Sequence, residues 1–188
     1  MVNLKSNYNN LLLEELKLDE ENIFLQILKI RNQKFVRENM YNNKIIGIDE
    51  HLNWIRYQLS QKTKKIFKVI FKKKLIGLII LSNISTVYKK SVWAFYLSKD
   101  AQTGLGALVE YKFLNLFFTN SDFENLNCEV LEFNKSVINL HKKFGFEVKN
   151  IIKNRVVRNG MAYNAIFMRI NKNKWQISKK KIEKKLKL

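Results

Sequence analysis

The stretch KDAQTGLGALVEYKFLNLFF, residues 99–118, begins with polar residues, passes two glycines and continues as a long apolar pattern. Its apolar residues recur every three or four positions, as in a helix with one buried face: Leu105, Leu108, Val109, Phe113, Leu116 and Phe117. Gly104 and Gly106 then lie at the first turn, where unpartnered N–H groups carry a partial positive charge and glycine lets a ligand approach the backbone. The stretch predicts a phosphate site, although a glycine turn before a core helix fits the same residues.

Length and composition predict one folded domain. A chain of 188 residues can bury a proper core but is short for two domains, and 46% hydrophobic with 12% aromatic residues argues against disorder. The longest strongly apolar run, residues 75–81, is far shorter than the roughly 20 residues of a membrane-spanning helix. The first ten residues, MVNLKSNYNN, lack the basic and then apolar order of a signal peptide. We therefore expect a cytoplasmic protein.

Charge and metal-ligand content restrict the partners. Cys128 is the single cysteine and the chain has two histidines, so no zinc-ligand spacing exists and we expect no metal. The net charge of +19 is spread along the chain, which favours a solvated basic surface and leaves a nucleic-acid-binding module as an alternative. Residues 171–188 hold eight lysines and one glutamate. We expect a domain over residues 1–170 and a disordered or frayed basic tail over 171–188, with a basic helix on a membrane or an acidic partner as the alternative.

The remaining patterns alternate between strands and helices. Strands are expected over 11–18, 65–72, 75–85, 91–98, 126–133, 146–157 and 161–170, and further helices over 20–39, 49–59 and 134–144. Asp49 is the expected N-cap of its helix, and Gly145 the expected C-cap of the last one. Asn159-Gly160 predicts a tight hairpin turn between the final two strands.

That order, with a glycine turn after the fourth strand, resembles the GCN5-related N-acetyltransferase (GNAT) family. The segment QTGLGA, residues 102–107, looks like the acyl-CoA pyrophosphate loop of the family, which reads Gln or Arg, two residues, Gly, one residue, and Gly or Ala. Gly104 and Gly106 match this loop. Ala101 occupies the Gln/Arg position, and Gln102 comes one place late.

The segment LNCEVLEFNKSVINLHKKFGFE, residues 126–147, is similar to a second unit of the family, a strand, an Asn, a helix and a Gly-Phe pair. Glu129 lies on the strand, Asn134 ends it, and Gly145-Phe146 closes the helix. Family members commonly carry a tyrosine seven residues after the Asn, as the general acid for the leaving thiolate, where this chain has His141. The resemblance implies a mixed α/β fold with about seven strands and about four helices, splayed between the fourth and fifth strands.

The resemblance also implies acetyl-CoA as co-substrate. It places these residues around the coenzyme: Tyr96, Leu97, Gln102, Thr103, Gly104, Leu105, Gly106, Ala107, Asn134, Ser136 and Lys143. Glu129 would take the proton of the amine and His141 would protonate the CoA thiolate. A free imidazole titrates near pH 6.5, against about 10 for tyrosine, so we expect a lower pH optimum than for a tyrosine enzyme. From the residues alone, Glu129 could instead be a surface carboxylate paired with a lysine, and His141 a core histidine.

The N-terminal third resembles the branch of the family that acetylates nucleotide-linked amino sugars. Six residues carry this likeness: Arg31, Asn32, Met40, Tyr41, His51 and Trp54. The branch implies direct acetyl transfer, in a ternary complex, to the 4-amino group of a UDP-linked amino-deoxy sugar of the pseudaminic acid pathway, which modifies flagellin and other surface glycans. The uracil base would stack on Tyr41 or Trp54, and Arg31 would grip the diphosphate.

Each of these acceptor residues also fits a structural role. Arg31 could pair with a carboxylate, Met40 and Tyr41 could cover the core, and Trp54 could be buried packing. The alternative functions are acetylation of a protein N-terminus or another small amine, and the nucleic-acid-binding module. We expect a monomer or homodimer without a membrane span.

Overall fold

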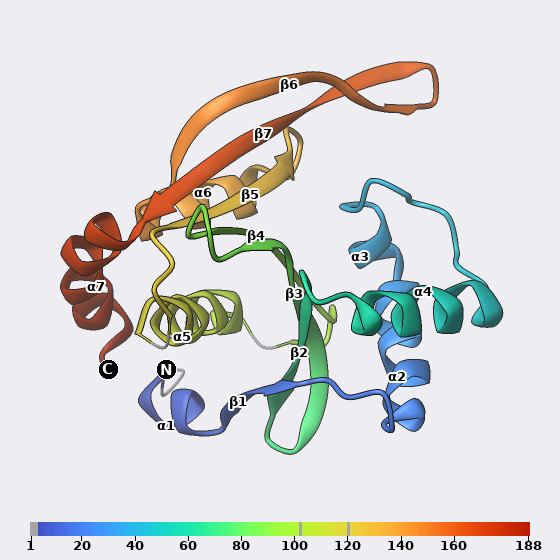
Figure 1. Ribbon diagram of the computed structural model, residues 1–188, viewed down its shortest axis with the longest axis horizontal. Coiled ribbons are helices and arrows are strands. Elements are labelled where there is room, and N and C mark those ends of the chain that lie inside the picture. Colours follow the sequence, from blue (N-terminus) through green and yellow to red (C-terminus); the bar gives the residue numbers. More distant parts are fainter. Residues whose placement is uncertain (1–3, 102, 120) are drawn as a thin grey trace.

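The computed structural model describes residues 4–101, 103–119 and 121–188, and its centre is one mixed sheet with strand order β1-β2-β3-β4-β5-β7-β6 (Figure 1). The strands are β1 (Leu11–Glu15), β2 (Lys65–Phe71), β3 (Lys74–Ser85), β4 (Lys90–Leu97), β5 (Asn125–Leu131), β6 (Glu147–Arg158) and β7 (Met161–Asn171). This confirms the expected mixed α/β fold with seven strands. Asn159 and Gly160 form the predicted turn between β6 and β7, both with positive φ.

The described residues form seven helices, more than the four or so expected. They are α1 (Leu4–Asn9), α2 (Glu21–Arg31), α3 (Lys34–Arg37), α4 (Ile48–Ser60), α5 (Leu105–Thr119), α6 (Lys135–Phe144) and α7 (Lys172–Leu186). The helix expected over 20–39 is interrupted because Gln33 adopts an extended ψ of 132°. Helix α4 begins one residue before Asp49, so Gly47 is its N-cap. Within the described part of the chain, none of the helices combines the length and hydropathy that a membrane span requires.

Helix α7 corrects the expectation of a disordered or frayed tail over residues 171–188. Its Trp175 is 1% exposed, and Ile182 and Leu186 are also buried. On the neighbouring helix α5, Tyr111 donates a hydrogen bond of 2.6 Å to Glu183. The segment is therefore part of the domain core, with most of its lysines on the outer face.

The sheet is covered on both faces, and alternate residues of its central strands point to opposite cores. On one face, Ile79 and Trp93 pack with residues of α5, α6 and α7. On the other face, Ile66 and Leu78 pack with residues of α2 and α4. Figure 1 shows α2, α3 and α4 on one side of the central strands and α5 and α7 on the other.

Strands β4 and β5 are the one parallel pair of neighbours among the described strands, and they pair only over Lys90–Val92 and Asn125–Asn127. Beyond these residues β4 stays paired with β3 up to Leu97, and β5 stays paired with β7 up to Leu131. The facing edges of β4 and β5 therefore separate, which confirms the predicted splay. Such edges leave backbone donors and acceptors free for a ligand.

Gly77 on β3 lets the backbone of β4 approach closely at the splayed end. It lies opposite Leu97, and a Cβ atom added to it would be 2.2 Å from the carbonyl oxygen of Tyr96. An isolated glycine inside a strand often marks such a close approach. The position of Tyr96 and Leu97 thus depends on the absence of a side chain at residue 77.

We expect Gly77→Ala to lower the free energy of unfolding by about 1–3 kcal/mol, because the added methyl group overpacks a backbone contact. Urea unfolding followed by circular dichroism measures this loss. Gly47→Ala is the matched control, because a Cβ atom there meets nothing within 4 Å. Equal losses in the two variants would contradict the close-approach argument.

Candidate active site

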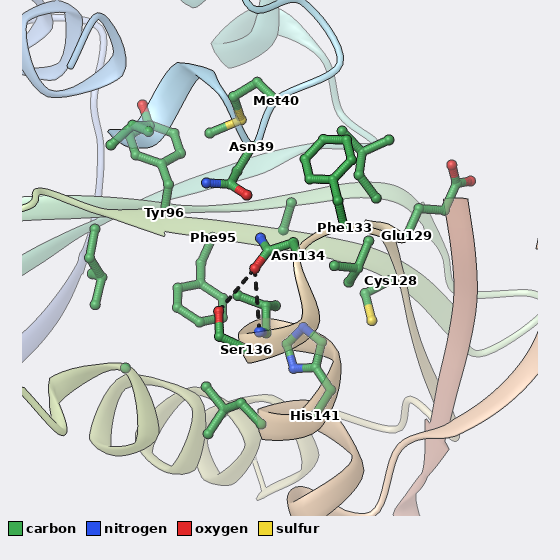
Figure 2. Close-up of a pocket in the computed structure, with 18 of the residues that line it drawn as sticks. Asn39, Met40, Phe95, Tyr96, Cys128, Glu129, Phe133, Asn134, Ser136 and His141 are labelled. Atoms are coloured by element: carbon green, nitrogen blue, oxygen red, sulfur yellow. Dashed lines mark hydrogen bonds between the residues drawn. The ribbon is translucent and has the colours of Figure 1, made fainter. Parts of the chain in front are cut away.

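A cavity of about 570 Å³ opens where β4 and β5 separate (Figure 2). Its walls begin at Trp93 on β4 and Cys128 on β5, the residues that directly follow the last paired positions. The segment from Phe35 to Tyr41 closes one end, and residues of α6 and Gly106 of α5 complete the lining. The splay of the two strands therefore creates the cavity.

Five of the residues expected around the coenzyme line this cavity: Tyr96, Leu97, Gly106, Asn134 and Ser136. The others do not. Thr103 and Gly104 are exposed at the start of α5, Leu105 faces the core, Ala107 is half-buried and Lys143 is exposed on α6. Gln102 lies outside the described residues. The Leu105 side chain thus packs in the core, so any contact of Leu105 with the coenzyme would come from the backbone of this residue.

The start of α5 has the backbone geometry that the glycine pattern predicted. Gly104 has a φ of 90°, which disfavours residues with a side chain. Its carbonyl accepts hydrogen bonds from the N–H groups of Ala107 and Leu108, which begin the helical ladder. Gly106 lines the cavity, and a Cβ atom added to it would make only an ordinary contact of 3.8 Å with Leu140.

The N-terminus of α6 also opens on the cavity. Asn134 is its N-cap, and the Asn134 side-chain oxygen accepts from the N–H of Val137 at 3.4 Å and from the Ser136 hydroxyl at 3.1 Å (Figure 2). At the other end Gly145 adopts a φ of 104°, as expected for the C-cap. The capping side chain therefore fixes the helix that carries His141.

A cluster of three side chains lies at the end of the cavity that is lined by Tyr41 and Glu129. The Tyr41 hydroxyl donates to Glu129 Oε2 at 2.6 Å, and Arg155 Nη2 lies 3.4 Å from the same oxygen. The Arg155 guanidinium also lies over the Tyr41 ring, 4.9 Å from its centre. Burial, and then the hydrogen bond to Glu129, raises the pKa of Tyr41 to about 12, so this hydroxyl remains a donor. Glu129 is thus paired with an arginine rather than with a lysine.

Arg31 and Asn32 do not line the cavity. The Arg31 guanidinium donates to the carbonyl of Asn42, not to a carboxylate. The Asn32 side chain donates to the carbonyl of Ile46 and accepts from its N–H, both at 2.9 Å. The two residues expected to grip the nucleotide therefore fasten the loop that follows α3.

Arg158, on the hairpin formed by β6 and β7, holds the same segment from the opposite side. It donates to the carbonyls of Glu38 and Met40, and its guanidinium lies 4.8 Å from the ring centre of Phe133. Met40 and Phe133 both line the cavity. The hairpin thus positions two residues of the cavity lining.

His51 and Trp54 also lie away from the cavity, although the sequence pattern placed them at the nucleotide. His51 is 2% exposed, and its Nε2 lies 2.9 Å from the carbonyl of Phe24, so it joins α4 to α2. Burial lowers the pKa of His51. Trp54 stacks on His51 and is 38% exposed, so it is neither deeply buried nor part of the cavity lining.

His141 is both a core histidine and a cavity residue. It is 2% exposed, and its Nδ1 lies 2.8 Å from Oε1 of the fully buried Glu110 on α5. Burial alone lowers the pKa of His141, but Glu110 and Cys128 outweigh this effect and raise the pKa to about 10. The expectation of a lower pH optimum is therefore corrected, because it assumed a free imidazole.

Three residues of the site escaped the sequence analysis: Glu110, Arg155 and Arg158. Glu110 did leave a signal, because a carboxylate inside an apolar helix pattern is rarely buried without a partner. The two arginines left none. Arg158 donates to carbonyls that lie more than a hundred residues earlier in the chain, and Arg155 pairs with Glu129 on another strand.

We expect Gly104→Ala to weaken acetyl-CoA binding at least tenfold, because a side chain at a φ of 90° is strained and would shift the amides at the start of α5. Gly106→Ala should change binding much less, since its Cβ atom has room. Isothermal titration with acetyl-CoA compares the two variants. Equal affinities would show that the first turn of α5 is not the anion site.

The sequence was compared with protein families and curated proteins. A family model described as "Acetyltransferase (GNAT) domain" matches residues 16–167. Acetyltransferase PseH of Campylobacter jejuni is 26% identical over 148 residues, which cover 79% of this chain and 86% of that protein.

Solved structures provide a second comparison. Spermidine N-acetyltransferase from Vibrio cholerae, in complex with CoA and spermine, superposes with a TM-score of 0.79 at 18% identity, covering 89% of this chain and 99% of that one. A dodecameric form of the same V. cholerae enzyme gives a TM-score of 0.73, again at 18% identity, covering 89% of this chain and 96% of that one. At this identity the likeness concerns the fold.

Proposed function

Because the chain belongs to the GNAT family and is an acetyl-CoA-dependent N-acetyltransferase, we propose that its acceptor is the 4-amino group of a UDP-linked amino-deoxy sugar of the pseudaminic acid pathway. The observation that carries this proposal is the end of the cavity at Tyr41 and Glu129, where the acceptor would bind. Its lining is mostly aromatic and apolar, and Glu129 is the one carboxylate among the described residues that line it. The similarity to Acetyltransferase PseH of Campylobacter jejuni supports an acetyltransferase with a related acceptor.

A polyamine acceptor, suggested by the solved relatives, fits this cavity poorly. A polyamine carries several ammonium groups, and each one taken from water needs an anionic or hydrogen-bonding partner. Here Glu129 already pairs with Arg155, and the whole chain has a net charge of +19. A positive field attracts anionic substrates and repels cationic ones. These charges favour a nucleotide sugar over spermidine.

An amino-deoxy sugar would match the chemistry of the lining. The methyl group of a 6-deoxy sugar would lie against apolar side chains such as Met40 and Phe133. Arg155 is partly exposed beside Tyr41 and is the guanidinium best placed for the diphosphate, since Arg31 is engaged by the loop. Tyr41, in place of Trp54, is then the aromatic ring that would lie near the uracil.

The proposed reaction is a direct transfer in a ternary complex. The amine nitrogen attacks the thioester carbonyl, so that an N–C bond forms and the C–S bond breaks. Glu129 accepts the proton that the amine loses, and His141 donates a proton to the departing CoA sulfur. Backbone groups on the open edge of β4, near Tyr96 and Leu97, would hold the carbonyl and the pantetheine arm.

An acceptor panel tests the substrate. We expect free CoA to appear with UDP-4-amino-deoxy sugars, and much more slowly with spermidine or with peptides that carry a free N-terminus. The same sugars should raise the melting temperature in the presence of CoA, because a ligand that binds only the folded state stabilises it. Faster turnover of spermidine would reject the sugar assignment. Duplex DNA binding without any response to acetyl-CoA would instead favour the nucleic-acid module.

Glu129→Gln tests the proposed base. The amide keeps the size of the side chain but cannot take a proton, so we expect kcat to fall about 100-fold with little change in KM for acetyl-CoA. Glu132→Gln is the matched control. Glu132 lies three residues further on, binds Asn164 and does not line the cavity. A comparable loss of kcat in both variants would remove Glu129 from the mechanism.

His141→Phe should reduce kcat about 100-fold or more if His141 is the acid, and His141→Tyr, which restores the usual acid of the family, should lose less. A pKa raised to about 10 keeps the proton available below that pH and releases it above. The wild-type rate should therefore hold through mildly alkaline pH and decline only near pH 10. A loss of less than fivefold in His141→Phe would retire the assignment.

A further inference from the structure

We propose that Glu110 is a positioning residue for acetyl transfer, which holds His141 by its Nδ1 atom and keeps one proton shared between the two side chains. The inference deepens the proposed function, because it rests on His141 as the acid. Glu110 itself lies on α5 and does not line the cavity. Its effect on the reaction would pass through His141 alone.

The contacts of Glu110 point to this role. It is fully buried, and its Oε1 lies 2.8 Å from His141 Nδ1. Its other oxygen, Oε2, has no hydrogen-bond partner in the part of the chain that the structure describes. A buried carboxylate is strongly unfavourable unless it is paired. If residue 110 served only to pack α5, an apolar side chain there would give a more stable fold than a carboxylate.

The surroundings of His141 make Glu110 its main electrostatic partner. The ring is packed by Trp93 and Phe95 of β4 and by Phe146. The charged or titratable groups that act on it are Glu110 from α5 and Cys128 from β5. Lys142 and Lys143, its neighbours on α6, are exposed. Figure 2 shows His141 pointing from α6 into the cavity, beside Cys128.

The donor is the Nε2–H group of His141 whether the shared proton resides on His141 or on Glu110. If the proton is on Nδ1, the pair is an imidazolium with a carboxylate. If it is on Glu110, the neutral imidazole carries its remaining proton on Nε2, because Nδ1 accepts from the carboxylic acid. In both arrangements Nε2 keeps an N–H bond. This nitrogen takes no part in the contact with Glu110, and the other side-chain hydrogen-bond partner of the ring is Cys128.

Proton transfer from this pair to the CoA thiolate conserves protons and charge and leaves a stable pair of side chains. The Nε2–H bond breaks and an S–H bond forms on the CoA thiolate, while Nδ1 keeps or receives the shared proton. The products are a neutral imidazole and the Glu110 carboxylate, and the pair recovers a proton from solvent in the next cycle. Burial raises the pKa of Glu110, while that carboxylate and Cys128 raise the pKa of His141 against the effect of burial, so the proton stays in the pair at neutral pH.

NMR titration of the His141 ring in 15N-labelled protein tests the pair. The chain has only two histidines, so a His141→Phe sample assigns the signals. We expect the wild-type ring to keep its Nε2 proton, with no change of protonation state until well above pH 8. In Glu110→Gln we expect the ring to titrate at or below the free value of about 6.5. Cys128→Ala should lower the pKa less than Glu110→Gln does. Tyr111 is the next residue of α5, and its hydroxyl donates to Glu183 of α7. Tyr111→Phe removes this hydrogen bond and should leave the pKa of His141 unchanged.

Kinetics supply the second readout. In Glu110→Gln the alkaline decline of kcat should move to lower pH together with the NMR titration, with KM for acetyl-CoA unchanged, and Glu110→Asp should restore part of the shift. A wild-type His141 that titrates at or below pH 6.5, or an unchanged titration in Glu110→Gln, would overturn the inference. If Glu110→Gln does not fold, the wild-type titration decides alone. The NMR measurement needs no acceptor, so its failure is distinct from failure of the sugar assignment.

Discussion

Hydrogen bonding between β4 and β5 stops after Val92 and Asn127, and the residues that begin the cavity walls follow directly. Each strand keeps its other neighbour, so the separation leaves only the facing edges unpaired. Backbone groups left unpaired and away from water are unfavourable unless a ligand or ordered water satisfies them. The open edges are therefore suited to an extended ligand such as the pantetheine arm of a coenzyme.

The point of separation is fixed by buried contacts. The Asn127 side chain donates to the carbonyl of Ser91 at 3.1 Å and accepts from Arg169 at 2.8 Å. Just beyond it, Trp93 stacks on Phe113 of α5, with ring centres 4.9 Å apart. The side chain that begins the β4 wall thus also anchors the helix whose first turn is the expected phosphate site. The same helix carries Glu110, so one rigid element links the coenzyme end of the site to the proton donor.

The fold was predictable where local signals were strong. The glycine turn, the periodicity of α5, the Gly145 cap and the Asn159-Gly160 turn each depend on a few neighbouring residues, and the structure has them all. Helix α7 was missed because its many lysines suggested a solvated tail, although Trp175, Ile182 and Leu186 follow a helical spacing. Composition outweighed periodicity in that interpretation.

The site was predictable only in part, for a physical reason. Met40, Tyr41, Glu129 and His141 do line one cavity, although they come from distant segments. Arg31 and Asn32 matched a pocket pattern, yet a pattern cannot tell a side chain that contacts a ligand from one that supports the loop beside it. Glu110, Arg155 and Arg158 depend on partners from other elements of the chain, and such pairs leave little trace in local sequence.

The loop after α3 is fastened by guanidinium and amide groups from two distant parts of the chain, α2 and the hairpin of β6 and β7. Transplanting that loop alone into a related scaffold would leave its carbonyls without donors, and the donors of the recipient without acceptors. A change of acceptor preference by engineering would therefore require exchanging the loop together with Arg31, Asn32 and Arg158.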